Sequence, residues 1–206
     1  MNEKPLIHVV EDDESLRNAL LRQLNSAGLE ARGYGSTGEF LLQPPPQRPG
    51  CVLLDLRLPG PSGLDLQAAL PDKGITLPVV FMTGNPDFAS SVRAMKAGAV
   101  DFLEKPIEPQ QLFGALQRAL ALDLRQRATR VETSDLRQRF AQLTPREHEV
   151  LERVVGGLLN KQIADELGIA ERTVKAQRAQ LMEKLGVGSA AELGVLAERL
   201  RHLASE

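Results

Sequence analysis

The sequence of 206 residues predicts an α/β domain followed by a smaller all-α domain, and three observations support this division. Short apolar runs alternate with segments of helical periodicity as far as residue 109, which is typical of a parallel sheet with helices on both faces. No strand signal follows that point. A strong helix start then comes at Thr144-Pro145-Arg146-Glu147, where threonine can cap the helix, proline suits its first turn and glutamate can reach back to the cap.

The first domain is predicted from five units, each a strand followed by a helix. In the first unit Leu6–Val10 is an apolar run, and Leu16, Leu20 and Leu24 then recur at helical spacing until Gly28. The other predicted strands are residues 29–34, 52–54, 78–82 and 100–103. The predicted helices are residues 14–27, 37–42, 63–70, 87–97 and a last helix that begins near residue 109. We therefore expect a five-stranded parallel sheet in a domain that spans residues 1–120.

Residues 121–142 are predicted to form a helical linker. Residues 110–142 carry 6 basic and 3 acidic side chains, and the linker contains neither glycine nor proline, which favours a helix continuous with the last helix of the first domain. Thr133 and Ser134, however, lower helix propensity, and Ser134 or Asp135 could cap a fresh helix. The sequence alone leaves both interpretations open.

The second domain, residues 143–206, is predicted to contain four short helices that are separated by glycines. Its middle pair is Asn160–Leu167 and a helix that opens at Glu171, with a tight turn at Gly168 between them. Such a helix-turn-helix can lay its second helix in the major groove of DNA. The residues expected on the internal face are Ile163, Leu167, Val174 and Leu181.

Composition excludes several other classes of protein. With 42% hydrophobic and 25% charged residues the chain resembles an ordinary soluble protein, and no apolar run is long enough to span a bilayer. We therefore expect a cytoplasmic location and no membrane partner. The single cysteine, Cys51, excludes an internal disulfide and any zinc spacing. The net charge of −2 conceals an acidic beginning, because residues 1–109 carry 10 basic and 14 acidic side chains.

Chemically useful residues follow four of the predicted strands. Asp12 and Asp13 follow the first strand, and Asp55, Thr83 and Lys105 follow later ones. The carboxyl ends of parallel strands share one edge, where open α/β sheets bind their ligands. Aspartates gathered there would repel one another without a cation, and oxygen ligands favour Mg²⁺. The pattern predicts phosphoryl transfer to an aspartate, with Lys105 neutralising one phosphoryl oxygen and Thr83 hydrogen-bonding another.

Residues 5 to about 120 resemble the receiver domain of a bacterial two-component response regulator. The motifs that carry the resemblance are Val9-Val10-Glu11-Asp12-Asp13-Glu14, Leu54-Asp55-Leu56-Arg57-Leu58-Pro59-Gly60, Met82-Thr83-Gly84 and Asp101-Phe102-Leu103-Glu104-Lys105-Pro106. The resemblance implies a flavodoxin-like sheet of order 2-1-3-4-5. It also implies a cis peptide bond between Lys105 and Pro106.

The receiver resemblance assigns roles to the residues at the sheet edge. Asp55 is expected to accept phosphate from the histidine of a sensor histidine kinase. Asp13, Asp55 and the backbone carbonyl of Arg57 are expected to bind Mg²⁺ directly, and Asp12 through water. Thr83 and Phe102 are expected to act as the switch that responds to the phosphoryl group.

Residues 143–206 resemble the LuxR-type DNA-binding domain. The resemblance rests on Leu143-Thr144-Pro145-Arg146-Glu147, Asn160-Lys161-Gln162-Ile163-Ala164, Thr173-Val174-Lys175 and Lys184-Leu185-Gly186-Val187. With a receiver in front, the chain is similar to the FixJ/NarL class of regulators. One departure is Gln177, where the family very often has histidine. The residues expected to contact DNA are Asn160, Lys161, Arg172, Thr173, Lys175, Ala176, Gln177 and Arg178.

These expectations describe a phosphorylation-controlled transcription factor. Its expected partners are a sensor histidine kinase, promoter DNA, a second copy of the chain on activation, and RNA polymerase. An aspartyl-phosphate enzyme of the haloacid dehalogenase type is the competing class, but such enzymes carry a second aspartate where this chain has Arg57. A regulator that binds RNA or another protein instead of DNA is disfavoured by the complete helix-turn-helix motif. We expect no enzyme activity beyond self-directed phosphoryl acceptance and autodephosphorylation.

Overall fold

The computed structural model describes residues 4–43, 45, 48–85 and 87–204. The chain divides into two compact units, Met1–Arg127 and Ala128–Glu206, which are described separately below. The division falls inside the segment predicted as the linker. Within the described part of the chain, no helix has both the length and the apolar character that a membrane crossing requires.

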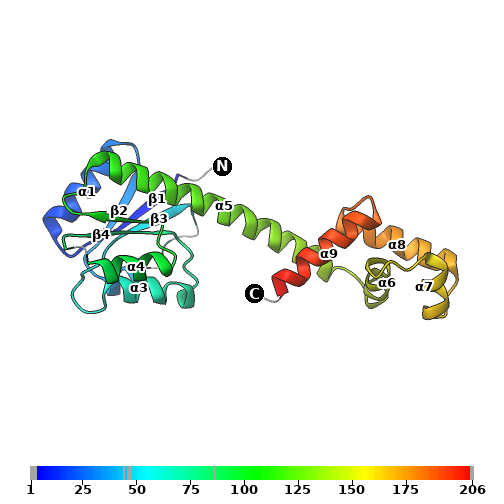
Figure 1. The fold of residues 1–206 in the computed structure, drawn as a ribbon. Helices are drawn as coiled ribbons and strands as arrows, with labels where there is room; N and C mark the ends of the chain where they lie inside the picture. The colour runs from blue at the N-terminus through cyan, green and yellow to red at the C-terminus, as the bar shows by residue number, and fades with distance from the viewer. Residues whose placement is uncertain (1–3, 44, 46–47, 86, 205–206) are drawn as a thin grey trace. The chain divides into compact units, whose positions relative to one another are not determined.

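The first unit is built on a five-stranded parallel sheet in the order β2-β1-β3-β4-β5, as predicted (Figure 1). The strands are β1 Leu6–Val10, β2 Glu30–Tyr34, β3 Gly50–Asp55, β4 Val79–Thr83 and β5 Asp101–Glu104. The helices between them are α1 Glu14–Ser26, α2 Thr37–Leu42, α3 Gly63–Ala69 and α4 Phe88–Lys96, with a short 3₁₀ turn η1 at Pro71–Lys73 that the sequence did not predict.

Two hydrophobic clusters cover the two faces of the sheet. Because side chains alternate along a strand, Val52 and Leu54 of β3 join a cluster with α2, α3 and α4, whereas Cys51 and Leu53 join a cluster with α1 and α5. Both faces of the three central strands, β1, β3 and β4, are therefore buried, which explains why these strands read as continuous apolar runs. Cys51 is fully buried, and this burial raises the pKa of its thiol to about 12.

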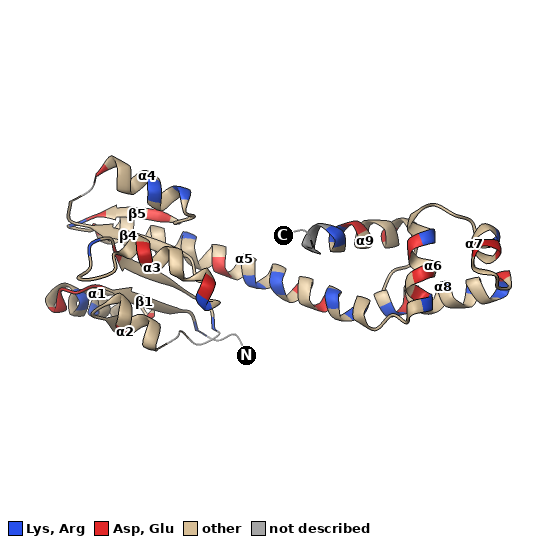
Figure 2. Ribbon diagram, turned by 90° about the horizontal axis from the view of Figure 1, so that it is seen from below, with Lys and Arg blue, Asp and Glu red and all other residues tan. Residues whose placement is uncertain are grey.

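Helix α5 runs without a break from Pro109 to Ala141. Of the two interpretations that the sequence left open, the structure contains the continuous helix, and no new helix begins at Ser134. Its first part packs in the first unit through Leu112 and Leu116, and its last turns belong to the second unit. Figure 2 shows basic residues recurring along it.

The second unit contains the four predicted helices, which follow the end of α5. They are α6 Pro145–Val155, α7 Asn160–Leu167, α8 Glu171–Leu185 and α9 Ala190–Ala204. The turn between α7 and α8 contains Gly168 with φ +64°, a left-handed conformation that glycine adopts at little cost. Of the predicted internal residues, Ile163, Val174 and Leu181 are fully buried and Leu167 is half-buried in the same core.

Candidate functional sites

The carboxyl edge of the sheet gathers the polar residues that follow the strands. Glu11 comes directly after β1, Asp55 and Thr83 are the last residues of β3 and β4, and Lys105 comes directly after β5. Glu11, Asp55 and Thr83 are all buried. The peptide bond between Lys105 and Pro106 is cis, as the receiver resemblance implied.

Lys105 joins the carboxylates of two strands. Its Nζ donates to Oδ2 of Asp55 and to Oε2 of Glu11, each at 2.6 Å. Its backbone N–H donates to the carbonyl of Thr83 at 2.7 Å, which fixes the start of its side chain against the end of β4. Lys105 therefore places one positive charge between two buried acids.

Burial and charge pairing shift the pKa values of Glu11 and Lys105 in opposite directions. Burial raises the pKa of Glu11, although the hydrogen bond from Lys105 acts in the opposite direction. Burial also disfavours the charged form of Lys105, but its hydrogen bonds to Asp55 and Glu11 outweigh that effect and raise its pKa. The ammonium group consequently remains protonated and available to a bound anion.

Three carboxylates could hold a metal ion at this edge. One oxygen each from Glu11, Asp12 and Asp55 lie within 4.8 Å of one another. All three are oxygen ligands, and Asp12 is exposed to solvent, which suits a hard cation that keeps some of its waters. The residues present therefore fit Mg²⁺.

Asp13 lies outside this group of three carboxylates, so the geometry does not favour it as the direct ligand that the receiver resemblance implied. Its Oδ1 accepts the backbone N–H groups of Ser15 at 2.8 Å and Leu16 at 3.0 Å, so Asp13 caps the start of α1. Glu11 takes the place in the cluster that the sequence analysis gave to an aspartate. The signal for Glu11 was its position, because it is the first residue after the buried run that ends at Val10.

Arg57 and Asn85 border the cluster. The N–H of Arg57 donates to Oδ1 of Asp55 at 3.0 Å. With its amide oxygen facing the guanidinium, Asn85 accepts from both terminal nitrogens of Arg57 at 3.2 Å. Thr83 Oγ1 accepts the N–H of Asn85 at 3.3 Å. Phe102 is half-buried on β5, and its ring centroid lies 6.3 Å from that of Phe81.

The helix-turn-helix exposes only some of the residues predicted to contact DNA. Lys161 on α7 and Arg172, Lys175 and Ala176 on α8 are exposed, whereas Thr173 is half-buried. Lys175 forms an exposed ion pair with Glu171 at 3.1 Å, which costs little to break. The exposed basic residues are therefore free to meet phosphates or bases.

Two other predicted contacts are held inside the domain. Arg178 is half-buried, and its Nη1 donates to Oδ1 of Asn160 at 3.0 Å, which braces α8 against the start of α7. Gln177 is also half-buried, and its Oε1 is buried without a hydrogen-bond partner among the described residues. These three side chains are thus partly committed to the domain itself.

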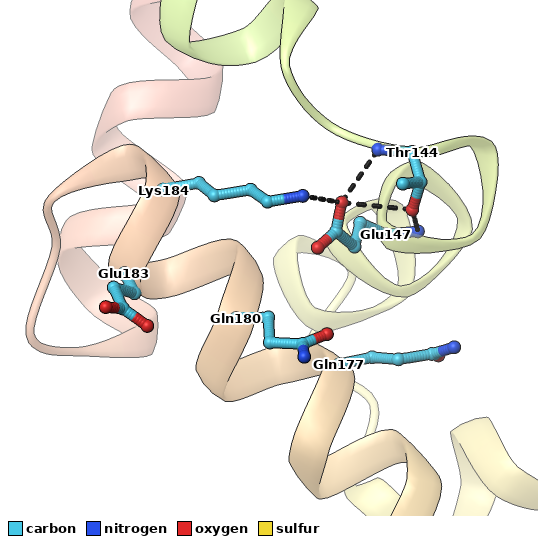
Figure 3. Close-up of a pocket in the computed structure, with 6 residues that line it drawn as sticks. All are labelled: Thr144, Glu147, Gln177, Gln180, Glu183 and Lys184. Carbon is cyan, nitrogen blue, oxygen red and sulfur yellow. Dashed lines mark hydrogen bonds and ion pairs between the residues drawn. The ribbon is translucent and has the colours of Figure 1, made fainter.

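Gln177 lines a cavity of about 470 Å³ between α6 and α8 (Figure 3). Across the cavity Glu147 forms a capping box with Thr144 and accepts from Nζ of Lys184 at 2.7 Å. The hydrogen bond from Lys184 holds the pKa of Glu147 below its usual value. Lys184 therefore ties α8 to the start of α6.

Comparison with known proteins supports both halves of the fold. A family model described as "Response regulator receiver domain" matches residues 7–117, and one described as "Bacterial regulatory proteins, luxR family" matches residues 141–197. A receiver domain followed by a LuxR-type domain defines a two-component response regulator that acts on transcription.

Relatives match over nearly the whole chain. Nodulation protein W from Bradyrhizobium diazoefficiens is 44% identical over 197 residues, which cover 96% of this chain and 87% of that protein. Transcriptional regulatory protein FixJ from Azorhizobium caulinodans is 40% identical over 193 residues, which cover 94% and 92%. A solved structure of the response regulator StyR has a TM-score of 0.86 and 45% identity, and the match covers 96% of this chain and 100% of StyR. The chain therefore belongs to the two-component response regulators of the FixJ/NarL class.

Membership of this family favours a transcription regulator over an aspartyl-phosphate enzyme, the two classes that the sequence analysis compared. The family consists of transcription regulators, so the haloacid dehalogenase alternative is not supported. A receiver domain implies a sensor kinase as partner, and a LuxR-type domain implies DNA binding.

Proposed function

We propose that Asp55 accepts a phosphoryl group from the histidine of a sensor kinase, and that this modification controls promoter binding by the second unit. The observation that carries the proposal is the position of Lys105, whose Nζ contacts both Asp55 and Glu11 at the carboxyl edge of the sheet. A nucleophilic carboxylate and a fixed cation are thereby placed where a phosphoryl group can be received.

The proposed transfer is an in-line displacement at phosphorus. A carboxylate oxygen of Asp55 bonds to phosphorus while the bond from phosphorus to the donor's imidazole nitrogen breaks, and that nitrogen keeps the electron pair and takes up a proton. Lys105 neutralises a phosphoryl oxygen, and the Thr83 hydroxyl donates a hydrogen bond to another. Glu11, Asp12 and Asp55 supply carboxylates for Mg²⁺, which would offset further phosphoryl charge. Asp12 replaces Asp13 as a proposed direct ligand, together with Asp55 and the Arg57 carbonyl.

Transmission follows from the new charge. Once Asp55 carries the phosphoryl group, its oxygens become new hydrogen-bond acceptors for Lys105 and Thr83. Thr83 shifts toward them, and Phe102 then moves inward. This changes the surface formed by α4, β5 and α5, which then pairs with a second copy of the chain. The phosphoryl group can shift this equilibrium only by the energy with which it favours one state.

The output of the proposed switch is transcription. The dimer binds promoter DNA through α8 and acts on RNA polymerase, in the cytoplasm. Residues 121–142 serve as the linker between the domains at 1–120 and 143–206. Hydrolysis of the aspartyl phosphate by the chain itself resets the switch.

The site assignment is tested by phosphorylation with a small phosphodonor in the presence of Mg²⁺. Wild type should gain one phosphoryl group, measured by intact mass. Asp55→Asn should gain none over the same reaction time, because an amide oxygen is too weak a nucleophile. Asp72→Asn, at an exposed aspartate of η1, is the matched control and should behave as wild type. Uptake by Asp55→Asn at the wild-type rate would refute the assignment.

A further inference from the structure

Arg17 reaches from α1 to the loop that carries the acidic residues. Its Nη1 donates to the backbone carbonyl of Glu11 at 2.6 Å and to that of Asp12 at 3.3 Å. On the other side of the same loop, the N–H of Glu11 donates to the carbonyl of Tyr34 at 3.0 Å. The peptide groups on both sides of Glu11 are therefore held by neighbouring elements.

Gly33 leaves the space through which the Arg17 side chain passes. Gly33 lies in β2, where glycine weakens a strand because it has no side chain to pack. A Cβ atom built at this position would lie 3.0 Å from Cδ and 3.1 Å from Cγ of Arg17, and 3.0 Å from Cδ1 of Leu21 on the same helix. The close approach of the arginine stem is thus a physical reason for glycine here.

The carboxylates that this loop presents have reason to move apart. One oxygen each from Glu11, Asp12 and Asp55 lie within 4.8 Å of one another. Lys105 supplies a single positive charge to these three carboxylates, so repulsion between them is only partly offset. A loop whose carbonyls were not held could relieve the repulsion by turning its side chains outward. Ordering it again would then reduce the affinity for any cation.

We propose that Arg17 is a positioning residue, which fixes the Glu11 and Asp12 backbone so that their carboxylates stay arranged for a divalent cation. The inference rests on the metal site in the proposed function and extends it to a side chain that does not touch the metal or the phosphoryl group. Arg17 acts through the two carbonyls, and Gly33 acts through Arg17.

Arginine suits this role better than lysine. A guanidinium offers several N–H donors in a rigid plane, so one nitrogen can serve two carbonyls while the plane keeps its orientation. An ammonium group at the end of a flexible stem could reach one carbonyl but would not hold both peptide groups. Arg17→Lys should therefore recover only part of the effect of Arg17.

The first test measures Mg²⁺ affinity of the full-length, unphosphorylated chain by isothermal titration calorimetry. Residues that hydrogen-bond to metal ligands without touching the metal typically contribute about 10-fold or more in metal affinity. We expect binding to weaken by about 10-fold in Arg17→Met, which keeps the stem but removes the donors, and by less in Arg17→Lys. Gly33→Ala should weaken binding in the same way, and the double variant should be no weaker than Arg17→Met alone.

Two matched controls separate positioning from general damage. Arg22→Met removes an exposed arginine of the same helix. Gly38→Ala adds a methyl group with no atom nearer than 3.8 Å. Both should bind Mg²⁺ as wild type does. The thermal transition of every variant is recorded, so that affinities are compared only between folded proteins.

A second readout needs no metal. Backbone hydrogen exchange of the segment around Glu11–Asp13, measured without Mg²⁺, should be faster in Arg17→Met and in Gly33→Ala and unchanged in Arg22→Met. Equal exchange and equal Mg²⁺ affinity in wild type and Arg17→Met would overturn the role of Arg17 while leaving the metal site intact. A wild-type chain that binds no Mg²⁺ would overturn the metal site and this inference together.

Discussion

His8 is a histidine that the fold keeps neutral. It lies in the middle of β1, almost fully buried, with its Nδ1 2.9 Å from the hydroxyl of Tyr34 and its ring edge-on to Phe40. Burial lowers its pKa from 6.5 to about 4, and the charges of Arg32 and Arg48 act in the same direction. Protonation of His8 is therefore easier in the unfolded chain than in the folded one.

This difference predicts how stability depends on pH. The contribution of neutral His8 is complete above pH 6.5 and is lost as pH falls toward 4, because the unfolded state binds the proton first. Between pH 7.5 and 5 the loss should be about 2 kcal/mol. Tyr34 is the only tyrosine in a chain without tryptophan, so its fluorescence during urea unfolding reports on the first unit.

The His8→Gln variant, which cannot titrate, should show a smaller loss over the same range of pH. His148→Gln, at an exposed histidine of the second unit, should keep the wild-type dependence. An unchanged dependence in His8→Gln would mean that His8 is not held neutral.

The acidic cluster contains one residue, Glu11, to which the sequence analysis gave no role. The receiver resemblance assigned metal ligands to Asp12 and Asp13 instead. In the structure Glu11 directly follows Val10, the last residue of β1, whereas Asp13 lies two residues further on, at the cap of α1. Asp55, Thr83 and Lys105 were placed correctly at this edge because each lies at the end of its own strand or directly after it.

At the scale of elements, a buried polar contact fastens α5 to the start of β3. Asp123 on α5 has no exposed surface, and its Oδ2 accepts the N–H of Gly50 at 3.0 Å and Nε of Arg127 at 2.7 Å. Arg127 also donates to the carbonyl of Arg48 at 2.7 Å. The other oxygen of Asp123 is buried with no partner within the described part of the chain.

Removing this acceptor should destabilise the first unit. In Asp123→Ala the buried N–H of Gly50 and part of the Arg127 guanidinium lose their acceptor, which should cost about 2 to 3 kcal/mol. Glu30→Gln, which breaks the exposed ion pair with Arg48, should cost less than about 1 kcal/mol. Urea unfolding followed by Tyr34 fluorescence compares the two, and equal losses would show that the α5 contact contributes no more than a surface pair.

Helix α8 separates residues that face solvent from residues that brace the domain. Lys175→Ala should weaken operator binding by about 1 to 3 kcal/mol if Lys175 reads a base, or lower the salt slope by about one if it contacts a phosphate. Arg178→Ala should instead lower the melting temperature of the second unit, because it removes the hydrogen bond to Asn160. Titrations of operator DNA at several salt concentrations test the first effect, and no change in either quantity would refute a DNA contact by Lys175.

Strands and helices were predictable to different degrees for physical reasons. The three central strands, β1, β3 and β4, are buried on both faces, so each reads as an apolar run, and the turn glycines mark the helices of the second unit. The continuity of α5 was not decided by sequence, because residues of low helix propensity near Ser134 compete with packing of Leu136 and Phe140 in the second core. Asp123 was also missed, since a polar residue on a helix reads as exposed until its hydrogen bond from the N–H of Gly50 is seen.

At the scale of the whole molecule, the account joins a phosphoryl acceptor in one unit to a DNA-binding helix in the other. The two units have separate cores, and only α5 belongs to both. We propose that a charge added at Asp55 acts through a change in the receiver surface, with dimerisation as the consequence. Two copies on DNA would read two half-sites about 10 base pairs apart or a multiple of that spacing.

Genome-wide DNA binding with and without phosphorylation at Asp55 tests this claim most directly. The account predicts that wild type with an active phosphodonor occupies sites with two-fold symmetry, and that Asp55→Asn under the same conditions loses most of that occupancy while Asp72→Asn retains it. Equal occupancy of the same sites by wild type and Asp55→Asn would contradict the account.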